Sequence, residues 1–123
     1  FEPLVKEGIL HLVDGEIDFD DNISLRIING HTFAQQMIKI SDSSNTILYC
    51  ADLMPFVSQI RIPYVMGYDL QPMITVQEKK KYLQLAVNEN WYLYFGHDPE
   101  FALATVKHSE KGIIQDKVYK DFE

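Results

Sequence analysis

A chain of 123 residues is long enough for one ordinary domain or for part of a larger one. Its content of 46% hydrophobic and 24% charged residues is typical of a globular protein, neither disordered nor membrane-spanning. The formal net charge of −7 argues against a nucleic-acid or membrane surface, because phosphate groups attract a basic footprint. The single cysteine, Cys50, excludes an internal disulfide and a cysteine-rich zinc site, and it is compatible with a cytoplasmic location.

Most of the chain has the pattern of short strands. Apolar runs separated by turn residues predict strands at residues 9–13, 16–19, 23–28, 36–40 and 46–50. A further apolar run predicts a strand at residues 91–95, and the tail predicts a hairpin of residues 101–107 and 113–119. Strands, one helix and then strands again indicate a mixed α/β layer whose sheet needs a cover on at least one face.

One helix is predicted near residues 76–88. Thr75 and Glu78 have the spacing of a capping box at its start, and the helix should end near Asn90. Its apolar residues fall on one face, and the lysines at positions 79–81 are expected to point elsewhere.

The stretch of residues 52–73 contains three prolines and Gly67, so it cannot form one regular element. It is unusually apolar for a loop, which is typical of a cover, a pocket wall or an interface.

Three polar residues stand at the ends of apolar runs, where loop-borne chemistry is normally built: His31, Asp52 and His97. Each also has a purely structural interpretation. His31 follows Asn29-Gly30, a strong turn signal, and Asp52 could cap a short helical turn. His97 could belong to a plain strand-to-turn exit with Asp98 as the cap, and His11 and His108 are expected to be structural only.

Taken together, two imidazoles and a carboxylate form a ligand set suited to zinc, iron or manganese. Three ligands make a poor two-metal site by themselves, because a dinuclear centre needs roughly twice as many donors. The set therefore predicts a metal site that is incomplete within this chain.

The order Gly30-His31-Thr32, then Tyr49 to Leu53, then Phe95 to Pro99 resembles the second half of the metallo-β-lactamase-fold hydrolases. The segment from Asp52 to Leu70 is similar to lactonase-like and uncharacterised members. The spacings, 21 residues from His31 to Asp52 and 45 from Asp52 to His97, are typical of that family. The resemblance implies an αββα fold, of which residues 1–123 would form the C-terminal half.

The resemblance also implies roles for the three residues. His31 would ligate the first of two divalent ions, Asp52 would bridge both ions and orient the nucleophile, and His97 would ligate the second. Zinc is expected first, with iron or manganese as alternatives. The family's His-x-His-x-Asp-His motif is absent from this sequence, which starts at Phe1, so we expect the N-terminal half of the same enzyme as a partner.

The expected function is hydrolysis of an ester, lactone or similar small molecule by a metal-activated hydroxide, although this chain alone should be inactive. We expect the apolar stretch to line the substrate pocket through Phe56, Ile60, Tyr64, Met66 and Tyr68. One sheet face should be bare without a second chain, the N-terminal half or a homodimer partner. The alternative is a non-catalytic binding or scaffold module with a degenerate or absent metal site.

Overall fold

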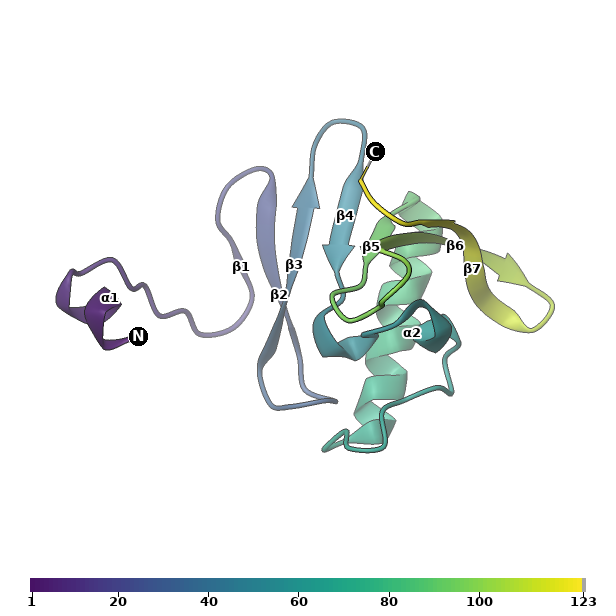
Figure 1. Ribbon diagram of the computed structural model, residues 1–123, viewed down its shortest axis with the longest axis horizontal. Coiled ribbons are helices and arrows are strands. Elements are labelled where there is room, and N and C mark those ends of the chain that lie inside the picture. The colour runs from purple at the N-terminus through teal and green to yellow at the C-terminus, as the bar shows by residue number, and fades with distance from the viewer. Residues whose placement is uncertain (123) are drawn as a thin grey trace.

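The computed structural model describes residues 1–122, which form one mixed seven-stranded sheet with a long helix against it (Figure 1). Sequential neighbours pair all along the sheet, in the order β1-β2-β3-β4-β5-β6-β7. The strands are β1 (Ile17–Asp18), β2 (Ile23–Ile28), β3 (Gln35–Ser41), β4 (Thr46–Tyr49), β5 (Tyr92–Tyr94), β6 (Leu103–Ser109) and β7 (Gly112–Tyr119). The helices are α1 (Glu2–Lys6), the 3-10 turns η1 (Ala51–Leu53) and η2 (Val57–Ile60), and α2 (Pro72–Glu89).

All the strand pairs are antiparallel except β4 and β5, which run parallel. Parallel neighbours need a crossover, and here α2 supplies it. This crossover places the ends of β4 and β5 at the same edge of the sheet, which matters for the site described below.

The predicted strands are confirmed with small shifts at their ends, except at residues 9–13. That segment has no regular structure, and Leu12 is 88% exposed. β1 is the edge of the described sheet, and the apolar run at residues 9–13 does not add a further strand beside it. A short helix, α1, precedes it and was not expected.

Helix α2 ends at Asn90, as predicted, in the left-handed conformation usual after a helix. Its start was predicted wrongly, because the helix begins one turn earlier with Pro72 in the first turn. Thr75 is therefore inside the helix, and it does not form the expected capping box with Glu78. The prediction that Lys79 points away from the core is also wrong, because its side chain is fully buried.

Helix α2 covers one face of the sheet and builds the core against it. Leu83 and Ala86 of the helix pack with the sheet residues Met37, Leu48 and Leu93, all 0–1% exposed. Among the described residues, no helix is both long and apolar enough to span a membrane.

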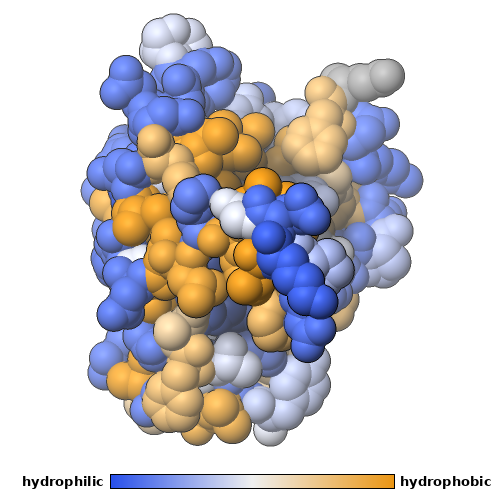
Figure 2. All heavy atoms as spheres, turned by 90° about the vertical axis from the view of Figure 1, so that its left-hand side faces the viewer, coloured by the Kyte–Doolittle hydropathy of each residue, from blue (hydrophilic) through white to orange (hydrophobic). Residues whose placement is uncertain are grey.

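The opposite face of the sheet is apolar and carries no helix of the described chain. The register places alternate residues of neighbouring strands on this face, such as Ile40 beside Ile47 and Ile47 beside Tyr92. Ile38 is 37% exposed and Ile40 is 47% exposed. Seen from the side of β1 and the N-terminal segment, apolar side chains gather in the middle of the visible surface, and a hydrophilic segment crosses in front of them (Figure 2).

Candidate functional site

His31, Asp52 and His97 come together at one edge of the sheet. His31 lies in the loop between β2 and β3, Asp52 lies in η1 directly after β4, and His97 follows β5. Because β4 and β5 are parallel neighbours, their ends bring Asp52 and His97 side by side. The pairing of β2, β3 and β4 brings the His31 loop to the same edge.

The two imidazoles face different oxygens of the Asp52 carboxylate. His97 Nε2 lies 3.1 Å from Oδ1, and His31 Nε2 lies 3.5 Å from Oδ2. Gln35 Nε2 also donates a hydrogen bond to Oδ2, at 2.7 Å. Asp52 therefore does not cap a helical turn; η1 follows Cys50 and has no side-chain cap.

His31 is oriented by a buried carboxylate on its other side. Its Nδ1 lies 2.8 Å from Asp69 Oδ1, and the Asp69 side chain is 0% exposed. Thr75 of α2 donates its hydroxyl hydrogen to the second Asp69 oxygen, at 2.9 Å. Because a carboxylate accepts hydrogen bonds, Nδ1 is the donor to Asp69, and Nε2 is the ring nitrogen that faces Asp52.

The His31 loop is attached to the start of α2 through its backbone. The Glu78 carboxylate accepts hydrogen bonds from the backbone N–H groups of Asn29 and Gly30, at 2.7 and 3.0 Å. The Gln71 N–H donates to the Gly30 carbonyl at 2.8 Å. A Cβ at Gly30 would lie 2.5 Å from Thr75 N and 2.6 Å from its Cα, so only glycine permits this close approach.

The apolar segment over the site is held in place by Asp98 and Lys79. Asp98 accepts backbone hydrogen bonds from Val57, Glu100 and Phe101, at 2.9–3.0 Å. It therefore caps the turn that follows it, which was one of the interpretations of the sequence. Partial burial raises the pKa of Asp98, but these donors outweigh that effect and hold it below its usual value.

Lys79 donates to three backbone carbonyl groups of this segment, at 2.5–2.7 Å. The carbonyls belong to Gln59, Arg61 and Tyr64, so α2 fixes the chain just before it returns to the site. Burial lowers the pKa of Lys79 to about 8, and the nearby Asp69 carboxylate opposes that shift.

A pocket of about 250 Å³ opens onto the three residues, and its walls are partly polar and partly apolar. It is lined by His31, Asp52, Pro55, Phe56, Met66, Tyr68 and His97. Phe56, Met66 and Tyr68 lie where the sequence predicted a pocket wall. The expectation was wrong for Ile60, which is fully buried in the core, and for Tyr64, which lines a separate groove.

Ala51 has a φ of +47°, in the left-handed region. The family resemblance places a glycine there, and alanine would be free of strain only at negative φ. Because φ is positive, Asp52 follows a strained residue. Tyr49, at the end of β4, has a raised pKa; burial is the largest cause, and the nearby Asp52 carboxylate adds to it.

The donors within residues 1–122 do not form a complete metal site. No group of three or more His, Cys, Asp and Glu side chains in this part of the chain is arranged to hold one ion. The geometry explains why, because His31 and His97 face opposite oxygens of Asp52 instead of one common point. The donor types nevertheless fit zinc, and the Asp69–His31 contact is the arrangement that commonly orients a metal-ligating histidine.

Solved structures that superpose on this chain include hydrolases, one described as probably metal-dependent and one as dizinc. A probable metal-dependent hydrolase from Staphylococcus aureus superposes with a TM-score of 0.80 at 21% identity, over 95% of this chain and 42% of its own. AidC, a dizinc quorum-quenching lactonase, gives a TM-score of 0.74 at 19% identity, over 95% of this chain and 40% of its own. The hydrolase AbOPH of the β-lactamase superfamily gives a TM-score of 0.70 at 15% identity, over 99% of this chain and 42% of its own. No protein-family model and no curated protein matches the sequence.

The described residues therefore have the α/β metallo-β-lactamase fold, as a partial domain with a mixed seven-stranded sheet and one main helix. The resemblance to the hydrolases of this superfamily, lactonases among them, is confirmed at the level of the fold. The chain spans only 40–42% of the length of these three structures.

Sequence reasoning missed the residues that support the site: Gln35, Asp69, Thr75 and Glu78. Asp69 lies 38 positions from His31, and nothing local to Gly67-Tyr68-Asp69 indicates a partner. The Thr75–Glu78 spacing is also that of a helix cap, and Thr75 and Glu78 instead bind Asp69 and the His31 loop. His11 and His108 are exposed, and His108 lies 3.4 Å from Gln84, away from the site residues.

Proposed function

We propose that the protein is a metal-dependent hydrolase in which His31, Asp52 and His97 ligate two divalent ions, zinc before iron or manganese. The observation that carries this proposal is the placement of one imidazole at each oxygen of Asp52, at 3.5 and 3.1 Å. That is the arrangement expected of a carboxylate that bridges two ions, with His31 on one and His97 on the other. A helix cap or a plain turn would not need it.

Each ion would receive two donors from this chain, one histidine and one oxygen of Asp52. Zinc in proteins usually takes three or four protein ligands, so further donors must come from elsewhere. We propose that residues 1–123 are the C-terminal half of the domain and that the N-terminal half supplies a His-x-His-x-Asp-His motif. This half would also cover the apolar sheet face, and homodimerisation is the second way to cover it.

When bound, such ions supply a hydroxide nucleophile near neutral pH by lowering the pKa of a ligated water. The residues of this chain have separate tasks. Asp52 would hold the two ions and orient the nucleophile, while Asp69 would keep His31 in the tautomer that leaves Nε2 free. Phe56, Met66 and Tyr68 give the pocket an apolar wall, which favours a neutral ester or lactone over a highly charged substrate.

The lactonase among the similar structures supports this substrate class, and the fold itself hosts many chemistries. A cytoplasmic location is part of the proposal, since the one cysteine is free and buried.

The test is the metal content of Asp52→Ala, measured by elemental analysis in the longest natural form of the protein. Removing the bridging carboxylate should reduce bound metal and hydrolysis steeply. His108→Ala changes an exposed histidine outside the site and should leave both near the wild-type level. Unchanged metal in the Asp52→Ala protein would remove the bridging role, and thermal unfolding of both variants would separate metal loss from misfolding.

The alternative, a non-catalytic module, makes a different prediction about the rest of the protein. If the sequence that accompanies this chain lacks the His-x-His-x-Asp-His motif, the site cannot be completed as proposed. Metal content that stays at background level in the wild-type protein would then favour the module.

A further inference from the structure

A second pocket lies away from the site, between the Arg61–Tyr64 segment and the turn that joins β6 to β7. Its volume is about 270 Å³, somewhat below that of pockets for drug-sized ligands. It is lined by Arg61, Ile62, Pro63, Tyr64, Lys111, Gly112, Ile113 and Ile114. These lining residues, here called the Arg61 groove, include two cations and no carboxylate.

The cations of the Arg61 groove differ from most others in the described chain. Arg26, Lys107 and Lys120 form ion pairs with carboxylates. Lys39 and Lys81 lie over aromatic rings, and Lys79 is buried among carbonyl groups. Within residues 1–122, neither the Arg61 guanidinium nor the Lys111 ammonium has an ion-pair or hydrogen-bond partner.

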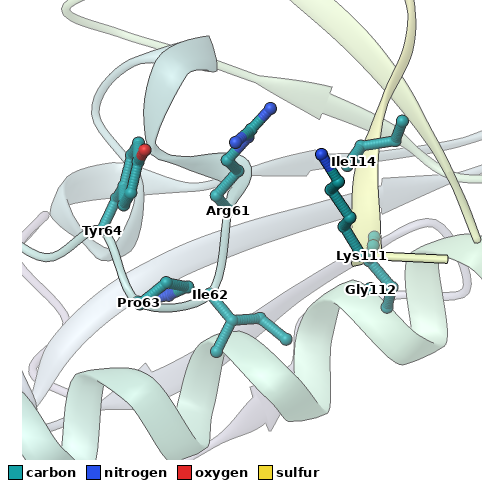
Figure 3. A pocket seen from close by; sticks show the side chains of 8 residues that line it. Arg61, Ile62, Pro63, Tyr64, Lys111, Gly112 and Ile114 are labelled. Carbon is teal, nitrogen blue, oxygen red and sulfur yellow. The ribbon is translucent and has the colours of Figure 1, made fainter. Parts of the chain in front are cut away.

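Both cations extend from opposite walls toward the same opening, with the Tyr64 hydroxyl on that side as well (Figure 3). Ile62 and Pro63 lie on the loop below the Arg61 and Tyr64 side chains, so the groove combines an apolar wall with two cations. The whole chain has a net charge of −7, but two free cations in one groove make the electrostatic potential there positive.

The backbone under each cation is held in place. Lys79 donates to the carbonyl groups of Arg61 and Tyr64 at 2.7 and 2.6 Å. On the opposite wall, the turn is closed by Ser109, whose hydroxyl donates to the Gly112 carbonyl at 2.7 Å and accepts from Lys111 N–H at 3.2 Å. Because the backbone is already fixed, only the two side chains lose conformational freedom when a ligand binds.

We propose that the Arg61 groove binds a small organic anion, with its carboxylate or phosphate group between Arg61 and Lys111 and its apolar body on Ile62 and Pro63. Arginine and lysine form charge-assisted hydrogen bonds with either group. The groove does not involve His31, Asp52 or His97, so this proposal stands independently of the metal site.

The experiment is a titration of the purified protein with benzoate and phenyl phosphate, followed through the backbone amide resonances of Ile113 and Ile114. Both anions should bind saturably, while benzyl alcohol, which has the same ring without the charge, should not. Inorganic phosphate should bind about fivefold more weakly than phenyl phosphate or worse, since it lacks the apolar body.

Arg61→Met and Lys111→Met should each weaken binding about fivefold or more. Lys117→Met is the matched control, because Lys117 is an exposed lysine on β7 outside the groove, and it should bind as the wild type does. Absence of saturable shifts would overturn the proposal. It would also be overturned by equal weakening in all three variants, because that result would indicate only general charge attraction.

Discussion

The residue before Asp52 is under backbone strain that can be measured. Ala51 adopts a φ of +47°, which costs an L-residue with a Cβ about 1–2 kcal/mol relative to right-handed conformations. Glycine removes this cost but gains freedom in the unfolded chain, so part of the benefit is lost. Ala51→Gly should therefore raise the free energy of unfolding by up to about 1 kcal/mol in urea denaturation.

The comparison variant is Ala86→Gly, at a buried position inside α2. There glycine has no strain to relieve and weakens the helix, so stability should fall by about 1 kcal/mol or more. A loss of stability in Ala51→Gly as well would show that the positive φ is not strained.

At the residue scale, the sequence predicted which side chains meet but not what orients them. His31, Asp52 and His97 each follow an apolar run, and strand ends share sheet edges, so their convergence could be expected. Asp69 and Gln35 lie in segments without such a pattern. Their positions depend on how the apolar stretch folds back over α2, which no local signal indicates.

The element that positions His31 is the first part of α2, and Gly30 tests the contact. A methyl group at Gly30 would overlap the Thr75 backbone, so Gly30→Ala must move the loop or the helix. Such overpacking should lower the free energy of unfolding by about 1–3 kcal/mol. Gly67→Ala is the matched control; its Cβ would meet nothing within 4 Å, and stability should change by less than about 0.5 kcal/mol.

Crystal structures or amide spectra of Gly30→Ala should also show a displaced His31 loop. Equal stability of the two alanine variants would contradict the close approach of the loop to α2.

The link between α2 and the segment over the site should depend on pH through Lys79. The pKa of folded Lys79 is about 8, below the ordinary value of 10.5. Between these values the unfolded chain binds more protons than the folded one, so stability rises with pH across that window. The free energy of unfolding of the wild type and of Lys79→Met should be compared from pH 7 to pH 11. Above about pH 8 the wild type should become more stable relative to the variant. A constant difference would contradict the lowered pKa.

At the scale of elements, periodic apolar patterns predicted the strands and the end of α2 well. The start of α2 was wrong because Thr75 and Glu78 have the spacing of a capping box while they bind Asp69 and the Gly30 loop. The strand at residues 9–13 was wrong because an apolar run does not by itself show whether the segment pairs with a sheet edge. Lys79 was assigned to the surface because a buried ammonium with three carbonyl partners has no sequence signature.

Over the whole molecule, two observations point the same way. The sheet has an apolar face that no helix of residues 1–122 covers, and each oxygen of Asp52 faces only one histidine. Both are expected of one half of a two-sheet domain, and the match to only 40–42% of three similar structures agrees with this. The second half would cover the face and complete the metal ligands at once.

The most direct test of this account is a crystal structure of the longest natural form of the protein grown with zinc, with anomalous scattering used to locate the metal. We predict two zinc ions, one about 2.0–2.2 Å from His31 Nε2 and the other at that distance from His97 Nε2, with Asp52 bridging them. Zinc peaks that leave Asp52 unligated, or no peak at His31 and His97, would contradict the proposed metal site.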